Sequence, residues 1–186
     1  MKHLFAVALA ASIGFGLVTT GSALAYAPPN QPIKNYSRIA TLPPLAYQIF
    51  CLKNPGECRT STQGMVHNTT ALMNKVAKVN LAVNRSMIAK ADGAADVWTV
   101  GANAGDCEDF ALNKRHQLIA MGVPAGALRM AVVKTSGGQG HAVLIVHTDG
   151  GDYVLDNLTN AIKPLGKSGL KLVAMSTANP DKWKNS

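Results

Sequence analysis

Apolar residues recur at helical spacing between residues 68 and 90, the longest periodic stretch of the chain. They lie three and four residues apart, as on one face of an α-helix, at Leu72, Val76, Val79, Val83 and Met87. Asn68 or Thr69 can cap the start of this helix, because both side chains offer an oxygen to unpaired backbone N–H groups. The stripe predicts a helix that packs against a hydrophobic core.

A second helical pattern begins at Cys107 and continues without glycine or proline until Gly122. Asp106 is suited to the N-cap position, and Asp109 three residues later completes a capping-box pattern. Gly122 and the proline two residues after it predict the end of the helix. The apolar positions again have helical spacing: Phe110, Ala111, Leu118 and Met121.

Two apolar runs flank the turn sequence Thr148-Asp149-Gly150-Gly151, which predicts a β-hairpin. If these four residues form the loop, His147 faces Asp152. Because side chains alternate between the two faces of a strand, His141 and Asp156 then share one face as diagonal neighbours. A two-residue loop would place them directly opposite each other, and a three-residue loop would put them on different faces.

The remaining segments have weaker patterns. They are a short helix over Pro44–Leu52, an irregular stretch over Ala91–Ala104, a strand over Leu128–Thr135 with a flexible loop to Gly140, and one or two further strands between Ile162 and Met175. A chain of 186 residues can bury a good core and suits a single domain.

Residues 1–25 have the composition of a secretory signal peptide. A short basic start precedes an apolar run over residues 4–18, and small residues then offer a cleavage site. Cleavage is expected after Ala25, or after Ala27 as the alternative, so that residues 26–186 form one domain in the periplasm or outside the cell. The apolar run is short for a membrane span, and a retained N-terminal anchor is the alternative interpretation.

Export gives the three cysteines different expected roles. Cys51 and Cys58 flank a turn-rich segment and are expected to form a disulfide in an oxidising compartment. Cys107 is then an unpaired thiol at the start of a helix, where the helix dipole favours the thiolate. This position predicts a nucleophile, and a small buried hydrophobic residue is the alternative.

The formal net charge is +8, with basic residues scattered along the chain, Lys114 and Arg115 among them. Because no basic block with interleaved aromatic residues is present, nucleic acid is not expected as a partner. We interpret the positive charges as a solvated surface. The alternative is a long-range attraction to acidic substrates or envelope polymers.

Three residues have the side chains of an acyl-transfer triad: Cys107, His141 and Asp156. The thiolate would attack a carbonyl carbon, the imidazole would take and return the proton, and the carboxylate would fix the imidazole tautomer. The backbone N–H of Cys107 is a candidate oxyanion donor, and Trp98 and Asn103 are candidates for the second. His147 is the alternative base.

Three carboxylates surround the candidate nucleophile: Asp106, Glu108 and Asp109. Their negative charge raises the pKa of the thiol and opposes the helix dipole. Helix capping is the ordinary explanation. The alternative is a hard cation such as Ca²⁺, which takes oxygen ligands and would offset the repulsion, although no EF-hand spacing is present.

Several motifs of the chain resemble those of one known family. They are Gly105-Asp106-Cys107-Glu108-Asp109-Phe110, His141-Ala142-Val143-Leu144, Val154-Leu155-Asp156-Asn157-Leu158, Asp96-Val97-Trp98 and the segment from Cys51 to Cys58. On these motifs the chain resembles the bacterial transglutaminase-like cysteine peptidases, roughly from Pro43 to Leu158. The resemblance implies an α+β, papain-like or transglutaminase-core fold, in which the nucleophile's helix packs on an antiparallel sheet bearing the histidine and aspartate.

The resemblance also implies a function. The LapG-like group of this family comprises periplasmic, calcium-dependent proteases that cut large surface adhesins. By resemblance, the triad would be Cys107, His141 and Asp156, and Asp106 and Glu108 would hold calcium. The substrate would be a protein or peptide, with an acidic surface adhesin as the specific expectation, and any contact with the membrane would be peripheral.

We therefore expect an exported thiol hydrolase, and specifically an endopeptidase, that needs no cofactor for the chemistry itself. One alternative is a transglutaminase or other acyl transferase, because an acyl-thioester can be resolved by an amine instead of water. The other is a non-catalytic, calcium-responsive binding module of the envelope with the same fold.

Overall fold

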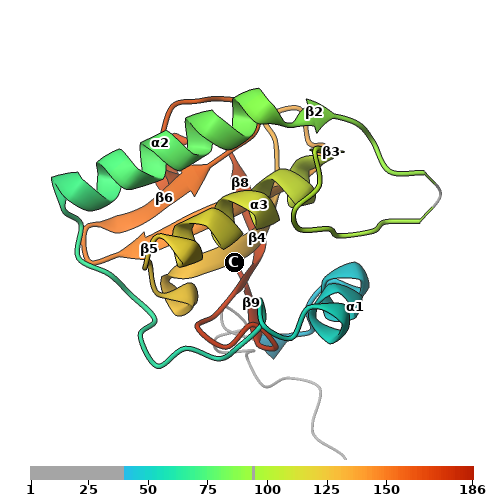
Figure 1. Ribbon diagram of the computed structural model, residues 1–186, viewed down its shortest axis with the longest axis horizontal. Helices are drawn as coiled ribbons and strands as arrows, with labels where there is room; N and C mark the ends of the chain where they lie inside the picture. Colours follow the sequence, from blue (N-terminus) through green and yellow to red (C-terminus); the bar gives the residue numbers. More distant parts are fainter. Residues whose placement is uncertain (1–39, 94) are drawn as a thin grey trace, which may run out of the picture. The chain divides into compact units, whose positions relative to one another are not determined.

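A computed structural model describes residues 40–93 and 95–186. The predicted signal peptide, residues 1–25, lies outside the described residues. Figure 1 shows the helices and strands, which are β1 (Ala40–Thr41), α1 (Leu45–Lys53), α2 (Thr70–Ser86), β2 (Ile88–Ala89), β3 (Ala104–Gly105), α3 (Cys107–Ala120), β4 (Leu128–Lys134), β5 (Gly140–Thr148), β6 (Gly151–Leu155), β7 (Lys163–Pro164), β8 (Lys171–Ser176) and β9 (Trp183–Asn185). None of the helices in the described ranges has the length and apolar character needed to span a membrane.

Most strands of the described residues join one antiparallel sheet. Its order is β1-β9-β8-β4-β5-β6-β7. Strand β9 therefore lies between β1 and β8. Strands β2 and β3 form a separate parallel pair, which brings the end of α2 beside the start of α3.

The central strands are apolar on both faces because both faces are covered. One face carries Leu144 and Leu155, which belong to a core shared with the helices. Figure 1 shows α2 and α3 side by side on this face. The other face carries Val143 and Val154, which pack against Leu165 and its neighbours from the C-terminal segment.

Helix α2 confirms the predicted start and buried stripe, but not the predicted end. Thr69 is the N-cap, and its hydroxyl accepts a backbone N–H of the first turn at 3.1 Å. The expected continuation to Lys90 is wrong, since the helix ends at Ser86. The chain leaves the helix because Ile88 pairs with Ala104 in the parallel β2–β3 pair.

Helix α3 closely follows its predicted bounds because both ends are capped. Asp106 and Asp109 form a capping box, in which the Asp106 N–H donates to the Asp109 carboxylate at 3.3 Å. At the other end Gly122 has a φ of +83°. The N–H groups of Gly122 and Val123 return to carbonyls of the last turn, each at 2.9 Å, which is a Schellman arrangement.

The β5–β6 hairpin has the predicted register, with His147 opposite Asp152. Its turn is shorter than the predicted four residues. Thr148 also pairs with Gly151, which leaves only Asp149 and Gly150 at the tip.

Strand β6 ends at Leu155, which pairs with Leu144, so Asp156 is the first residue beyond the ladder. The expectation that a two-residue loop would place His141 directly opposite Asp156 is therefore wrong. The shorter turn keeps the same register, because it arises from one more pair and not from a shift of the strands.

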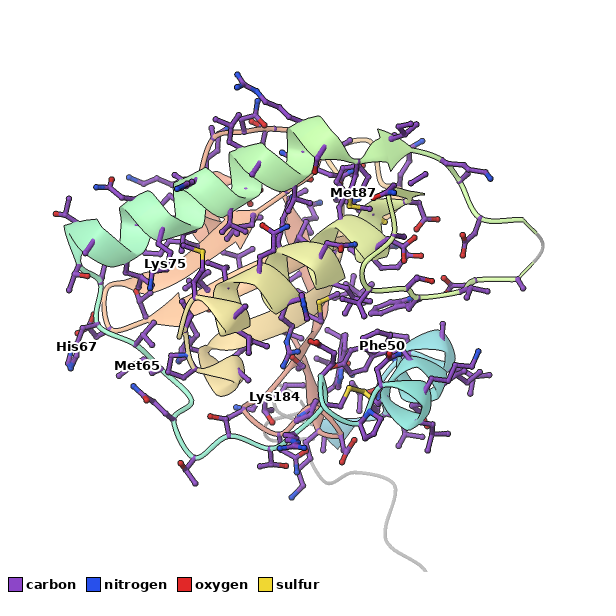
Figure 2. The ribbon with its side chains drawn as sticks, viewed as in Figure 1. Phe50, Met65, His67, Lys75, Met87 and Lys184 are labelled. Atoms are coloured by element: carbon purple, nitrogen blue, oxygen red, sulfur yellow. A yellow bond between two sulfur atoms is a disulfide. The ribbon has the colours of Figure 1, made fainter. Side chains whose placement is uncertain are left out.

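Helix α1 and strand β9 meet at a second part of the core. Cys51 of α1 is bonded to Cys58, as predicted, with the Cα atoms 5.4 Å apart. Figure 2 shows Phe50 pointing from α1 into the domain, where it is buried. The Tyr47 ring meets Trp183 of β9 edge to face at 5.4 Å, and β9 itself lies beyond the predicted C-terminal strands.

Candidate active site

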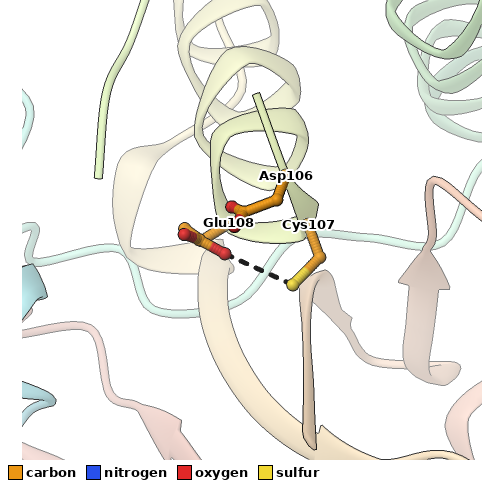
Figure 3. A group of neighbouring side chains, drawn as sticks. All are labelled: Asp106, Cys107 and Glu108. Carbon is orange, nitrogen blue, oxygen red and sulfur yellow. Dashed lines mark hydrogen bonds between the residues drawn. The ribbon is translucent and has the colours of Figure 1, made fainter. Parts of the chain in front are cut away.

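Cys107 is the first residue of α3, and its thiol is half-buried. The sulfur accepts the backbone N–H of Ala142, the second residue after the start of β5, at 3.3 Å. The thiol also donates to Glu108 Oε2 at 3.3 Å, as Figure 3 shows. The sulfur is thus held against the strand that carries His141.

His141 and Asp156 form a buried pair. Nε2 of His141 and Oδ1 of Asp156 are 2.8 Å apart, and both residues are less than a tenth exposed. The same carboxylate oxygen accepts the N–H of Leu158 at 3.0 Å. Burial raises the pKa of Asp156, but these hydrogen bonds outweigh it and hold the pKa below its usual value.

The thiol and the imidazole line one open cleft of about 360 Å³. Its walls come from β2, the start of α3, the β4–β5 loop and the segment after β6, and include Lys90, Gln139, Asn157 and Leu158. A larger depression of about 460 Å³ lies beside α1 and the disulfide, but none of the predicted triad residues lines it. The chemistry therefore points to the smaller cleft.

Burial and, to a smaller extent, the neighbouring carboxylates favour the protonated form of the Cys107 thiol. Burial raises the pKa of Cys107 to about 12; the N–H of Ala142 partly offsets this, and the negative charges of Glu108 and Asp106 add to it. Burial, together with Asp106, also raises the pKa of Glu108 to about 9. These carboxyl groups are unfavourable for an ionised thiol unless positive charge is brought to them.

Asp109 has a structural role. Its carboxylate accepts the N–H of Thr99 at 2.7 Å, besides that of Asp106. Burial raises its pKa to about 6, against the effect of the Thr99 N–H. Asp109 thus anchors the irregular segment before α3, as the capping interpretation expects.

The other carboxylates fit a hard cation. Asp92, Asp96 and Glu108 each offer an oxygen within 4.8 Å of the others, and Asp106 and Glu108 form a second such group with the thiol. Oδ1 of Asp106 and Oε1 of Glu108 are buried without a hydrogen-bond partner among the described residues. Oxygen donors converging in this way match the preference of Ca²⁺.

The sequence indicated Asp106 and Glu108 as candidate ligands, but it did not indicate Asp92 and Asp96, which the structure places beside Glu108. The missed pair lies in the irregular segment before α3, where periodicity gives no indication of what a residue faces. Their acidic character beside Gly93 was the available signal.

Trp98 and Asn103 do not line the candidate cleft. The indole N–H of Trp98 donates to Asp96 at 3.1 Å. Asn103 lines a different depression of about 220 Å³, between the end of α2 and the side of α3. Neither side chain serves as the second oxyanion donor in the proposal below.

The other described histidines have carboxylate partners outside the cleft. His147 and Asp152 are 2.6 Å apart, and His67 and Asp149 are 2.7 Å apart. His116, on the surface of α3, is 2.5 Å from Glu57. His147 is therefore not placed as a base for Cys107.

Lys114 and Arg115 are buried, which corrects their interpretation as part of a solvated surface. Arg115 donates to the backbone carbonyls of Glu57 at 2.6 Å and Leu128 at 3.2 Å. Lys114 is fully buried, with its ammonium 5.9 Å from the centre of the Phe110 ring. Burial lowers the pKa of Lys114 to about 7, although the negative charge of Asp156 acts in the opposite direction.

Comparison with known proteins gives one family and one set of solved structures. The family of bacterial transglutaminase-like cysteine proteinases (BTLCP) has a model that matches residues 37–185. Calcium-bound Legionella pneumophila LapG is 28% identical over 57% of this chain and 66% of that chain, with a TM-score of 0.52. A second LapG structure from the same organism is 29% identical over 57% and 64%, with a TM-score of 0.51.

The chain thus spans slightly less than two thirds of the length of these LapG chains. A comparison with curated proteins gave no match.

Proposed function

The chain belongs to the bacterial transglutaminase-like cysteine proteinases, and we propose that it is an exported endopeptidase with Cys107, His141 and Asp156 as its catalytic triad. The observation that carries the proposal is the 2.8 Å pairing of His141 Nε2 with Asp156 Oδ1, in a cleft that His141 shares with the Cys107 thiol. A half-buried free thiol at a helix start, beside a carboxylate-held imidazole, has the parts of a thiol acyl-transfer site.

We propose a reaction that uses these positions. Because Nε2 of His141 is held by Asp156, Nδ1 is left to take the proton of the Cys107 thiol. The thiolate attacks the substrate carbonyl carbon, and the backbone N–H of Cys107 donates to the developing oxyanion. His141 then gives the proton to the leaving amine, and water activated by the same imidazole hydrolyses the acyl-thioester.

We also propose that Ca²⁺ supports this site, held by Asp106 and Glu108 with Asp92 and Asp96 as further oxygen donors. Bound there, the cation would offset the negative charge beside the thiol. Glu108 matters most among the chain's own residues, because its carboxylate both belongs to the oxygen cluster and accepts the thiol hydrogen. The calcium-bound state of LapG supports the proposal by similarity.

We propose that the reaction takes place in the periplasm or outside the cell, because residues 1–25 have the composition of a signal peptide. A protein or peptide is the substrate class that the family implies. We propose an acidic surface protein of the adhesin type as the specific substrate, since the chain carries a formal net charge of +8 and opposite charges speed encounter.

The test is a proteomic comparison of bacterial envelope fractions treated with the protein or with its Cys107→Ala variant. The active protein should create new peptide termini that are absent with the variant. A parallel reaction with an added primary amine separates hydrolysis from acyl transfer, because transfer would label the new termini with the amine. Identical termini after both treatments would contradict the endopeptidase proposal.

A further inference from the structure

A loop, and not a strand, carries the carboxylate of the proposed triad. Strand β6 ends at Leu155, and Asp156 opens the segment whose next residues, Asn157 and Leu158, line the cleft. The bond from the Leu158 N–H to Asp156 Oδ1 forms a local Asx-turn. The sheet ladder therefore does not fix the position of Asp156, and contacts from another element must do so.

Two asparagines of α2 make those contacts. Asn84 Nδ2 donates to the backbone carbonyl of Asp156 at 3.0 Å, to that of Thr159 at 3.2 Å and to Oδ1 of Asn160 at 3.0 Å. Asn80, one turn earlier, donates to the backbone carbonyls of Thr159 and Asn160, each at 3.2 Å. One helix thus holds the whole loop from Asp156 to Asn160.

These asparagines interrupt an otherwise apolar helix face. Asn80 follows Val79 and precedes Val83 in the sequence, and its side chain is fully buried. Asn84, one turn later, is half-buried. Burying an amide costs free energy unless it is hydrogen-bonded. A valine or leucine could fill the same space, but it would leave the loop carbonyls without donors.

We propose that Asn84 is a positioning residue for the peptidase reaction. Its amide holds the backbone of Asp156, and the carboxylate of Asp156 in turn holds Nε2 of His141. Asn80 secures the far half of the same loop. The proposal rests on the proposed function, because it assigns Asn84 a role only through Asp156 and His141.

Loss of the Asn84 N–H donors should therefore change the orientation of the His141 imidazole more than it changes the stability of the fold. A catalytic group displaced by about 1 Å can lose roughly 100-fold in rate. Asn84→Ala should lower the rate at which iodoacetamide alkylates Cys107 by about 10-fold at a single neutral pH, since the thiol then loses its oriented proton acceptor. Asn84→Gln keeps two N–H donors and should restore most of this rate.

The experiment uses the full mature protein in calcium-containing buffer, well below the melting temperature of every variant. It measures the alkylation rate and the NMR signal of the ring N–H proton that His141 shares with Asp156. Asn74→Ala, at an exposed position of the same helix, is the matched control. Asn84→Ala should lose or shift the signal, whereas Asn84→Gln and Asn74→Ala should keep it.

Three outcomes would contradict one or other of the two proposals. If Asn84→Ala keeps both the wild-type signal and the wild-type alkylation rate, Asn84 has no positioning role. If the wild-type thiol is alkylated no faster than that of His141→Ala, the proposed triad itself fails, whatever the Asn84 variants do. A purely structural role for Asn84 would lower the melting temperature and leave the proton signal of the folded protein in place, which would also overturn the inference.

Discussion

At the scale of single residues, Lys114 is a buried charged group whose burial costs free energy. Its ammonium is fully buried, and burial lowers its pKa from 10.5 to about 7. Between these two pH values the unfolded chain binds a proton that the folded chain does not. The contribution of Lys114 to the free energy of unfolding therefore rises with pH from about 7 to 10.5, and below pH 7 the residue is at its most destabilising.

Replacement by the uncharged Lys114→Met should remove this cost. We expect the variant to have a larger free energy of unfolding at pH 6, by about 1–4 kcal/mol, with the gain shrinking as the pH approaches 10. Urea unfolding across this pH range measures the difference, and Lys78→Met, at an exposed position of α2, is the control. A difference between Lys114→Met and wild type that does not depend on pH would show that the folded protein does not lower this pKa.

The site residues were predictable to different extents for a physical reason. Cys107, His141 and Asp156 stood out in the sequence because each is a polar residue in an apolar or capped setting. Asp92 and Asp96 did not, because they lie in an irregular segment whose path is set by tertiary contacts. Among these is the bond from the Thr99 N–H to Asp109 of α3 at 2.7 Å.

At the scale of elements, the start of α3 depends on a glycine. Gly105 is buried, and a Cβ placed on it would collide with the carboxylate of Asp109. That carboxylate completes the capping box and also holds Thr99. The residue before the cap must therefore have no side chain.

Gly105→Ala should push the Asp109 carboxylate out of the capping box. Loss of a cap of this kind lowers the free energy of unfolding by about 1–2 kcal/mol. Gly166→Ala is the matched control, because a Cβ at that position meets no atom within 4 Å and should change the stability by less than about 0.5 kcal/mol. Chemical denaturation compares the two, and equal stability would show that the Asp109 carboxylate is not needed at the helix start.

Elements with local end signals were predicted well, and those defined by distant partners were not. The caps at Asp106 and Gly122 bounded α3 closely, because capping is a property of neighbouring residues. The end of α2 was misplaced by four residues, since only the pairing of Ile88 with Ala104 takes the chain out of the helix. Strand β9 pairs with β8 just before it and with the distant β1, and its short run of residues carries no alternation of its own.

At the scale of the whole molecule, the predicted α+β transglutaminase-core class is confirmed by the family match and the likeness to LapG. The class was recognisable because a few short motifs carry it. The order of the strands in the sheet could not be predicted from the sequence, because it depends on tertiary pairing that periodicity does not encode.

Calcium binding should be visible as a change in the stability of the protein as a whole. A ligand that binds only the folded state raises the melting temperature, and at about 100 times its Kd it adds roughly 2.7 kcal/mol. For a chain of this size we expect chelation to lower the melting temperature by roughly 5–10 °C. Differential scanning calorimetry with and without chelator measures the shift.

Glu108→Gln should melt at the same temperature with and without chelator, because it removes a proposed ligand of the cation. Asp181→Asn, at an exposed position on the C-terminal segment, should keep the full shift. If the melting temperature of the wild-type protein does not respond to chelator, the proposal that it binds calcium is wrong.

The position of β9 has a consequence for the order in which the protein can assemble. The strand stands between β1 and β8, and Trp183 at its start is fully buried. Until the ribosome has added residues 183–185, Ala40 and Thr41 have no sheet edge to join, and Tyr47 lacks one of its aromatic neighbours, Trp183. The sheet thus cannot be completed before residues 183–185 have been made, and the proposed export would benefit from a chain that has not yet closed its sheet.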